Sequence, residues 1–235
     1  MSLFSMQNVS YFDNLTQIIQ KTSLNIEKGT VTALLGEPGS GKSTILKLLA
    51  GIIIPSSGKI FYNDKNIFKM KESDKMDFRL HTAFMFQNSA LWANQSIYQN
   101  LELPLKIHFP QMSDGERDIK IKEMIKLVEY NKSLQIRPAS LSIGEQKKIA
   151  FARALICKPD TLFLDEPTES LDEVTTDLFI SIIKEFCYNK NTLIYVSHDK
   201  KFVDTFQNDK YYFSNGSIVD SILFNQNEQE DYDEI

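Results

Sequence analysis

The run GEPGSGKST at residues 36–44 combines closely spaced glycines with a lysine and hydroxyl residues, a set suited to holding phosphate. It fits G-x-x-x-x-G-K-[ST], in which the glycines let the backbone wrap around phosphate with its N–H groups pointing inward. A buried strand is predicted before it at Thr30–Gly36 and a helix after it at Ser43–Gly51, as the pattern requires. We expect Lys42 to neutralise the β- and γ-phosphates and Ser43 to ligate Mg²⁺. The expected nucleotide-binding residues here are Gly36, Glu37, Pro38, Gly39, Ser40, Gly41, Lys42, Ser43 and Thr44.

A second chemical element is the run TLFLDEP at residues 161–167, a buried strand that ends in two carboxylates. Adjacent strand residues point to opposite sides, so Asp165 and Glu166 are expected to do different work. Beside a phosphate-binding loop, Asp165 can hold a Mg²⁺-bound water. Glu166 can then polarise a water that attacks the γ-phosphate.

Composition limits the class of protein. The 235 residues are 42% hydrophobic and 24% charged, which is ordinary for one soluble domain with a sizeable core. The net charge of −5 makes general nucleic-acid binding a poor expectation. Cys157 and Cys187 are predicted to be buried thiols in a reducing compartment. Neither a signal peptide nor an apolar run long enough to span a bilayer is predicted, so we expect a cytoplasmic protein.

The residues of the phosphate-binding loop and the paired carboxylates must be positioned by alternating strands and helices. Strand patterns occur at residues 30–36, 58–64 and 82–87, and again at 161–167 and 192–199. Between Asn88 and about Pro159 only helical patterns are found. Ser113 with Glu116, and Ser142 with Glu145, have capping-box spacing there. A later helix carries Leu178, Ile182 and Phe186 at helical spacing. The pattern predicts an α/β fold with a parallel core and a helical insertion.

Taken in order, GEPGSGKST, Gln87, LSIGE (141–145), TLFLDEP, SLD (170–172) and His198 resemble the nucleotide-binding subunits of ABC transporters. The resemblance runs from about residue 3 to about residue 220. It implies a P-loop NTPase (RecA-like) parallel-sheet core, an N-terminal antiparallel β subdomain and an inserted α-helical subdomain. The implied ATPase domain covers 1–222, with the helical subdomain at about 88–158. The acidic end, 223–235, is expected to be a disordered tail.

The resemblance implies a role for each motif, with ATP and Mg²⁺ bound. Gln87 is similar to the glutamine that reaches the metal or the water and reports to the membrane subunit. His198 is similar to the histidine that contacts the γ-phosphate, and Ser170–Asp172 to the D-loop. The implied catalytic residues are Glu166, His198, Gln87 and Lys42. The implied metal ligands are Ser43, Gln87 and Asp165.

LSIGE resembles the family's signature motif, which serves the nucleotide of a partner subunit. The resemblance therefore implies a homodimer or pseudo-dimer in which Ser142 and Gly144 approach the partner's ATP. Ile143 and Glu145 depart from the commoner Leu-Ser-Gly-Gly-Gln, and Glu145 is expected to face the helix cap. Adenine is expected to stack on Tyr11 or on Phe12. The alternative for both rings is packing in the N-terminal sheet.

The segment at residues 85–108 carries the residues that indicate a type of transporter. Phe86-Gln87, Ser89-Ala90, Leu91-Trp92 and Asn100–Leu105 resemble ATPases of the Mla/Mce lipid-transport type. The resemblance implies docking on integral membrane permease subunits through about residues 88–105, on the inner face of the cell membrane. Lipoprotein release, amino-acid uptake and a signalling membrane complex without transport remain alternatives. The transported substrate and its direction stay open.

Overall fold

The computed structural model describes residues 2–206 and 209–219, and the acidic end at 223–235 lies outside them. The chain divides into two compact units, each described by itself. Unit 1 contains the described residues up to Glu72 and from Thr192 onward. Unit 2 is Ser73–Asn191. Within the described residues, no helix has the length and apolar character that crossing a bilayer requires.

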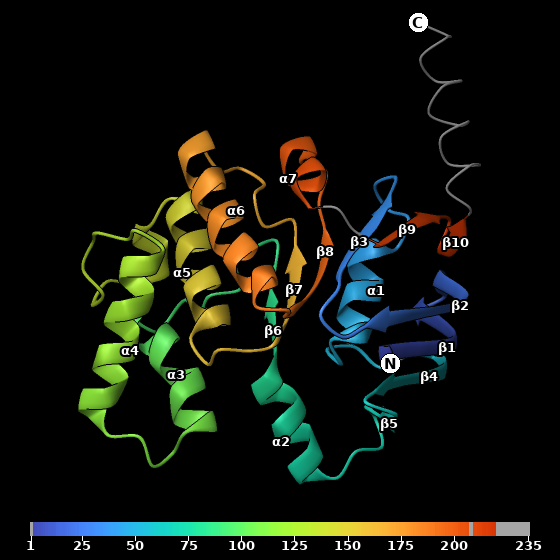
Figure 1. Ribbon diagram of the computed structural model, residues 1–235, viewed down its shortest axis with the longest axis horizontal. Coiled ribbons are helices and arrows are strands. Elements are labelled where there is room, and N and C mark those ends of the chain that lie inside the picture. Colours follow the sequence, from blue (N-terminus) through green and yellow to red (C-terminus); the bar gives the residue numbers. More distant parts are fainter. Residues whose placement is uncertain (1, 207–208, 220–235) are drawn as a thin grey trace, which may run out of the picture. The chain divides into compact units, whose positions relative to one another are not determined.

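Unit 1 opens with an antiparallel sheet whose strand order is β2-β1-β4-β5 (Figure 1). The strands are β1 (Ser2–Asp13), β2 (Thr16–Glu27), β4 (Ser57–Tyr62) and β5 (Lys65–Asn66). The β1–β2 connection turns at Asn14, which adopts a positive φ of 53° that asparagine tolerates. Asn8 also has a positive φ, and the pairing of β1 shifts register between Met6 and Val9 and again around Tyr11. These irregularities break the alternation that a regular strand would show.

Unit 1 also contains the strands beside the phosphate-binding loop. Strand β3 (Val31–Gly36) pairs in parallel with β8 (Thr192–Val196) and β9 (Asp209–Ser214), and β9 pairs with β10 (Ser217–Val219). Strand β8 is buried throughout, as expected for a parallel strand covered on both faces. The unit's helices are α1 (Lys42–Leu49) and α7 (Lys200–Thr205).

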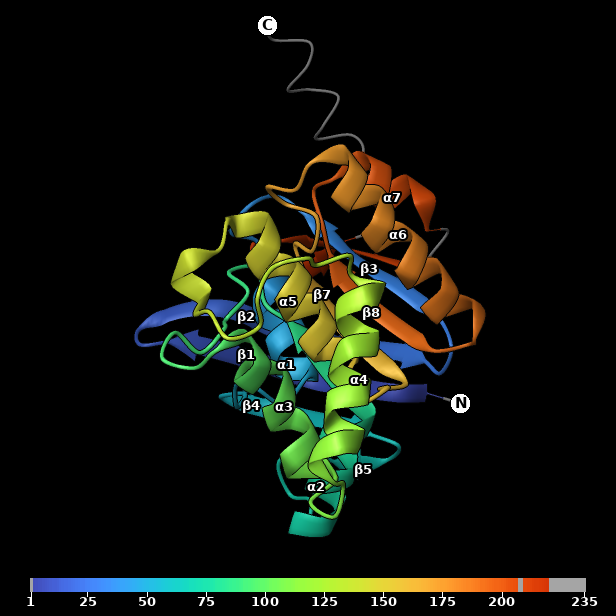
Figure 2. The ribbon, with the colours of Figure 1, turned by 90° about the vertical axis from the view of Figure 1, so that its left-hand side faces the viewer.

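Unit 2 has two parallel strands and most of the helices. Strand β6 (Thr82–Met85) pairs with β7 (Thr161–Asp165), so that Phe84 lies opposite Phe163. The helices are α2 (Glu72–His81), α3 (Ile97–His108), α4 (Asp114–Leu127), α5 (Ile143–Leu155), α6 (Glu173–Tyr188) and a 3₁₀ turn at Pro138–Ser140. Helices α3, α4 and α5 contact one another, and Figure 2 shows α3 beside α4.

Each of α3, α4 and α5 begins with a capping box. Ser113 with Glu116, and Ser142 with Glu145, confirm the predicted spacing, and Ser96 with Gln99 is a third example. The reciprocal bonds satisfy N–H groups that have no partner within the helix. Glu145 Oε2 accepts from Ser142 N at 2.9 Å, so this side chain faces the cap as predicted.

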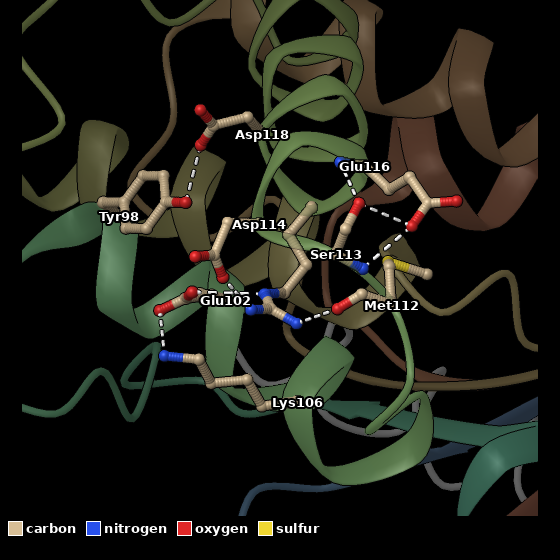
Figure 3. A network of polar contacts seen from close by, with 9 residues as sticks. Tyr98, Glu102, Lys106, Met112, Ser113, Asp114, Glu116 and Asp118 are labelled. Carbon is tan, nitrogen blue, oxygen red and sulfur yellow. Dashed lines mark hydrogen bonds and ion pairs between the residues drawn. The ribbon is translucent and has the colours of Figure 1, made fainter.

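A polar network joins α3 to α4 (Figure 3). Tyr98 donates its hydroxyl to Asp118 Oδ1 at 2.6 Å, and this bond, with burial, raises the pKa of Tyr98 to about 12. Arg117 is buried. Its Nε lies 3.3 Å from Glu102 Oε1, and its guanidinium also contacts Asp114 and the Met112 carbonyl. A buried guanidinium needs such partners because an unpaired charge is costly to desolvate. The network therefore fixes α3, which carries part of the predicted docking segment.

The structure shows which side of α6 is buried and corrects the predicted burial of the two cysteines. Of the apolar positions predicted on α6, Ile182 is buried, whereas Leu178 and Phe186 are half-buried. Phe179 and Ile183 of α6 are completely buried, and the Phe179 ring stacks on Phe151 of α5 with centroids 4.4 Å apart. The two cysteines are half-buried instead of fully buried, and burial raises the pKa of each thiol to about 11.

Candidate functional site

The phosphate-binding loop of unit 1 requires glycine at both of its ends. At Gly36 φ is +136°, and an added Cβ would lie 2.1 Å from the Phe213 carbonyl oxygen. At Gly41 φ is +99°, and a Cβ would lie 2.6 Å from Ile19 Cδ1. Both the backbone conformation and the lack of space exclude a side chain. The sequence predicted these glycines from the wrapping of the loop, and the neighbouring strands supply a second reason.

Several features of this loop would suit a bound anion. Lys42 is buried, and its ammonium donates to the Gly36 carbonyl at 2.6 Å and to the Glu37 carbonyl at 2.5 Å, which holds positive charge against the loop. Ser40 is buried, and its Oγ has no hydrogen-bond partner within the described part of the chain. Helix α1 begins after Gly41 without a side-chain cap. Its first N–H groups and its positive dipole end favour phosphate.

His198, the other predicted catalytic residue of unit 1 besides Lys42, follows β8. Its side chain is exposed in the loop before α7, next to the buried Ser197. Ser197 Oγ accepts from Asp199 N at 3.1 Å, and Asp199 caps α7. These short-range bonds set the backbone on both sides of the histidine.

The two aromatic candidates for adenine stacking lie at the irregular end of β1. Tyr11 is half-buried and Phe12 is 43% exposed. Phe12 N donates to Ser56 Oγ at 3.0 Å, which ties this end of the strand to the start of β4. Phe12 therefore presents more ring surface than Tyr11.

In unit 2, the paired carboxylates lie at the end of β7 as predicted. Asp165 is buried as the last residue of the strand. Glu166 follows with a φ of +48°, a left-handed conformation that costs a non-glycine residue about 1–2 kcal/mol. Strained backbone of this kind persists where surrounding contacts hold it, and it is frequent at functional sites.

Two polar contacts made by Glu166 and Glu169 were not identified from the sequence. Lys147 of α5 is 1% exposed, and its ammonium donates to the Glu166 carbonyl at 2.7 Å. Burial lowers the pKa of Lys147, while the charges of Glu169, Glu166 and Asp165 act in the opposite direction. Gln87 donates to both carboxylate oxygens of Glu169, at 3.0 and 3.3 Å. For the Lys147–Glu166 contact, the signal in the sequence was a lysine on the buried face of α5. For the contact between Gln87 and Glu169, the sequence offered no signal.

The signature residues start α5. Ser142 is its N-cap and is exposed, and the neighbouring Ile143 is also exposed. A Cβ added at Gly144 would meet Leu171 Cδ2 at 3.6 Å, which is an ordinary contact. Unlike at Gly36, no described part of the subunit is close enough to Gly144 to exclude a side chain there. Glu145 forms an ion pair with Lys132 at 2.7 Å, which together with the Ser142 cap lowers the pKa of its carboxyl group.

The segment that follows Gln87 displays Trp92, which is 44% exposed. Asn100 of α3 is completely buried and anchors this loop. Its Oδ1 accepts from Trp92 N at 2.8 Å, and its Nδ2 donates to the carbonyls of Trp92, Gln95 and Ser96. Beside the indole ring is a shallow groove lined by Trp92, Gln95, Gln99, Glu102, Leu103 and Lys106.

Comparisons with known proteins give consistent matches. A family model described as ABC transporter matches residues 19–169, and so includes parts of both units. The ABC transporter ATP-binding protein YtrE of Bacillus subtilis (strain 168) is 33% identical over 189 residues, which are 80% of this chain and 81% of YtrE. The lipoprotein-releasing system ATP-binding protein LolD of Buchnera aphidicola subsp. Schizaphis graminum is 34% identical over 187 residues, 79% of this chain and 81% of LolD.

A solved structure is similar over nearly the whole chain. It is the dimeric, post-hydrolysis state of the ATP-binding cassette MJ0796 bound to ADP and Pi. Its TM-score is 0.85 at 25% sequence identity, and the match covers 92% of this chain and 97% of that chain.

Proposed function

Because this chain belongs to the ABC transporter family as an ATP-binding subunit, we propose that it dimerises around two ATP molecules and drives a separate membrane permease. The predicted family and the predicted α/β P-loop NTPase fold are confirmed by the comparisons, and so is ATP hydrolysis coupled to transport. The observation that carries the proposal is the loop in which Lys42 is buried against the Gly36 and Glu37 carbonyls.

We assign the chemistry residue by residue. Lys42 and the loop from Gly36 to Thr44 bind the phosphates. Ser43, Gln87 and Asp165 offer hydroxyl, amide and carboxylate oxygens, the hard donors that Mg²⁺ prefers, and they would hold that ion. Bound Mg²⁺ supplies positive charge to the phosphates. Glu166 accepts a proton from the water that attacks the γ-phosphorus, as the bond to ADP breaks. His198 donates to the γ-phosphate.

The dimer proposal is supported by the open surroundings of Gly144. Among residues 2–206 and 209–219, nothing lies close enough to make glycine necessary there, and alanine is favoured over glycine in helices by about 1 kcal/mol. A position that keeps glycine against this preference suits close approach by something outside the subunit. We propose that this is the ATP held by a second copy, contacted by Ser142 and Gly144. For adenine stacking the candidates are Tyr11 and the more exposed Phe12.

We propose that both units belong to one ATPase domain covering residues 1–222. The family match crosses from unit 1 into unit 2, which supports a single domain. The helical subdomain within it is assigned to about residues 88–158, the part of unit 2 that holds α3, α4 and α5.

The proposed docking surface for the permease is the segment at residues 88–105. Its exposed Trp92 and the adjoining groove offer an aromatic anchor with a polar rim, the pattern of a binding hot spot. The Asn100 bonds and the α3–α4 network hold this surface in a defined shape. Through the permease, the subunit would be peripheral on the inner face of the cell membrane, with its bulk in the cytoplasm.

We expect Trp92→Ala to weaken binding to the permease by about 2 kcal/mol, as loss of an aromatic hot spot does, with little change in thermal stability. Copurification of permease with the variant, together with the melting temperature of the subunit alone, tests this. A melting temperature lowered by many degrees with docking unchanged would instead assign the indole to the fold.

Asn100→Ala is the matched comparison. Asn100 is wholly buried and holds the loop that bears Trp92. Removing it leaves buried backbone groups unpaired, at a cost of about 1–3 kcal/mol each. We therefore expect a clear fall in melting temperature for Asn100→Ala, measured under the same conditions as Trp92→Ala. Equal melting temperatures for the two variants would contradict this division of roles.

For the substrate, we propose phospholipid transport, on the pattern of residues 85–105 described above. Similarity to the lipoprotein-releasing protein LolD favours lipoprotein release as a second candidate. The native complex, reconstituted in vesicles, separates them. ATP-dependent movement of labelled phospholipid supports the first, and ATPase stimulation by lipoprotein without phospholipid movement supports the second. Stimulation by an amino acid would support neither of the two.

A further inference from the structure

Lys147 occupies a position on α5 that the helix pattern reserves for an apolar side chain. Lys147, Ala150, Phe151 and Ala154 follow the spacing i, i+3, i+4, i+7, and all four are buried. Burying an ammonium is unfavourable unless it is paired and hydrogen-bonded, so a lysine at this position has to be compensated by specific contacts.

The contact that the ammonium makes is with the main chain of one residue. Lys147 Nζ donates to the Glu166 carbonyl oxygen at 2.7 Å, a short distance typical of a charge-assisted hydrogen bond. The carboxylates of Asp165, Glu166 and Glu169 act electrostatically on the same ammonium. All of these groups belong to unit 2, so this arrangement lies within one compact body.

The Glu166 main chain is a place where a fixed peptide matters. Its left-handed φ of +48° is unfavourable for glutamate, and the following Pro167 further restricts the backbone of Glu166. The carbonyl that accepts from Lys147 belongs to the peptide between Glu166 and Pro167. Holding this oxygen fixes the orientation of that peptide, and thereby the direction in which the glutamate side chain leaves the strand.

We propose that Lys147 is a positioning residue for ATP hydrolysis, because its buried ammonium anchors the Glu166–Pro167 peptide and so orients the Glu166 carboxylate. This rests on the proposed role of Glu166 in activating water. Since Lys147 lies in the second turn of the helix that Ser142 begins, the anchor also ties the orientation of Glu166 to the position of the signature residues.

The test compares Lys147→Met with Lys147→Gln in the full-length chain. The two replacements have similar length, but only glutamine can donate a hydrogen bond. We expect Lys147→Met to lower kcat about tenfold or more while the ATP dissociation constant changes less than about twofold, because the phosphate-binding loop is not touched. We expect Lys147→Gln to recover most of the lost kcat. Lys148→Met is the control, since the Lys148 ammonium donates to the Glu129 carbonyl instead.

A double-mutant cycle with Glu166→Gln separates the two proposals. If Lys147 acts through Glu166, Lys147→Met adds little to the loss already caused by Glu166→Gln. Equal losses for methionine and glutamine at 147, fully additive losses, or unchanged kcat in Lys147→Met would each overturn the positioning role while leaving that of Glu166 intact. Near-parental turnover of Glu166→Gln itself would overturn the role of Glu166. Should Lys147→Met not fold, Lys147→Ala replaces it.

Discussion

Replacing Glu166 with glutamine is expected to lower ATP turnover by about 10²-fold or more, the contribution typical of a positioned general base. The amide keeps the size of the side chain but accepts a proton far less readily. ATP binding should survive, because the phosphate-binding loop with Lys42 is unaltered. The uncleaved nucleotide should then hold the dimer together, so sedimentation in ATP and Mg²⁺ should show a stable dimer.

The control for this substitution is Glu123→Gln, which removes an exposed carboxylate from α4. It should change turnover by less than about twofold, as surface substitutions remote from a site do. Turnover of Glu166→Gln within about threefold of the parent would remove Glu166 from the chemistry. The proton would then have to leave the attacking water by another route.

The second large effect is expected from mixing two inactive subunits. Lys42→Ala removes the ammonium from the loop, and Gly144→Asp places negative charge where we propose that the partner's phosphate lies. An aspartate in the first turn of α5 is favourable to that helix, so the fold should tolerate it. Each variant alone should lose about 10²-fold or more in turnover, since a lost phosphate donor or an added repulsion acts directly on the bound nucleotide.

In a mixed dimer, one composite site carries both lesions and the other carries none. An equal mixture is half mixed dimers by chance, so with independent sites roughly a quarter of parental activity should return, given two-fold symmetry. Turnover of the mixture against each variant alone measures this recovery. A mixture no more active than its components, with dimers present, would show that ATP is not shared between subunits or that both sites must be intact.

The parts of the fold that depend on short-range contacts were predictable from the sequence. The loop at Gly36–Thr44 and the capping boxes at Ser113 and Ser142 are each specified within a few residues, and the structure contains them. Helix α3 was not singled out, although Ser96 and Gln99 have the same spacing. It contains Pro104, and an internal proline normally argues against a helix.

The features that were missed depend on contacts between distant segments. The bond from Lys147 to Glu166 joins α5 to the end of β7, and no spacing rule relates two such positions. Local spacing also does not decide which side of α6 is buried. The run LFISII offers apolar positions in adjacent phases, and the stacking of Phe179 on Phe151 selects one of them. Where the local sequence allows several buried faces equally well, tertiary contacts select one of them.

The pairing of β3 has a consequence for the order in which the chain folds during synthesis. Its ladder partners are β8 and β9, both near the other end of the chain, and Gly36 is shaped around the Phe213 carbonyl. Helices α3, α4 and α5 each begin with a local cap and contact one another, and elements rich in such local contacts form early. On the ribosome, these helices can form before β8 and β9, the strands that pair with β3, have been synthesised. The lysine loop therefore acquires its final shape only after Phe213 has emerged, and a nascent chain stalled before β8 should not yet be retained by immobilised ATP.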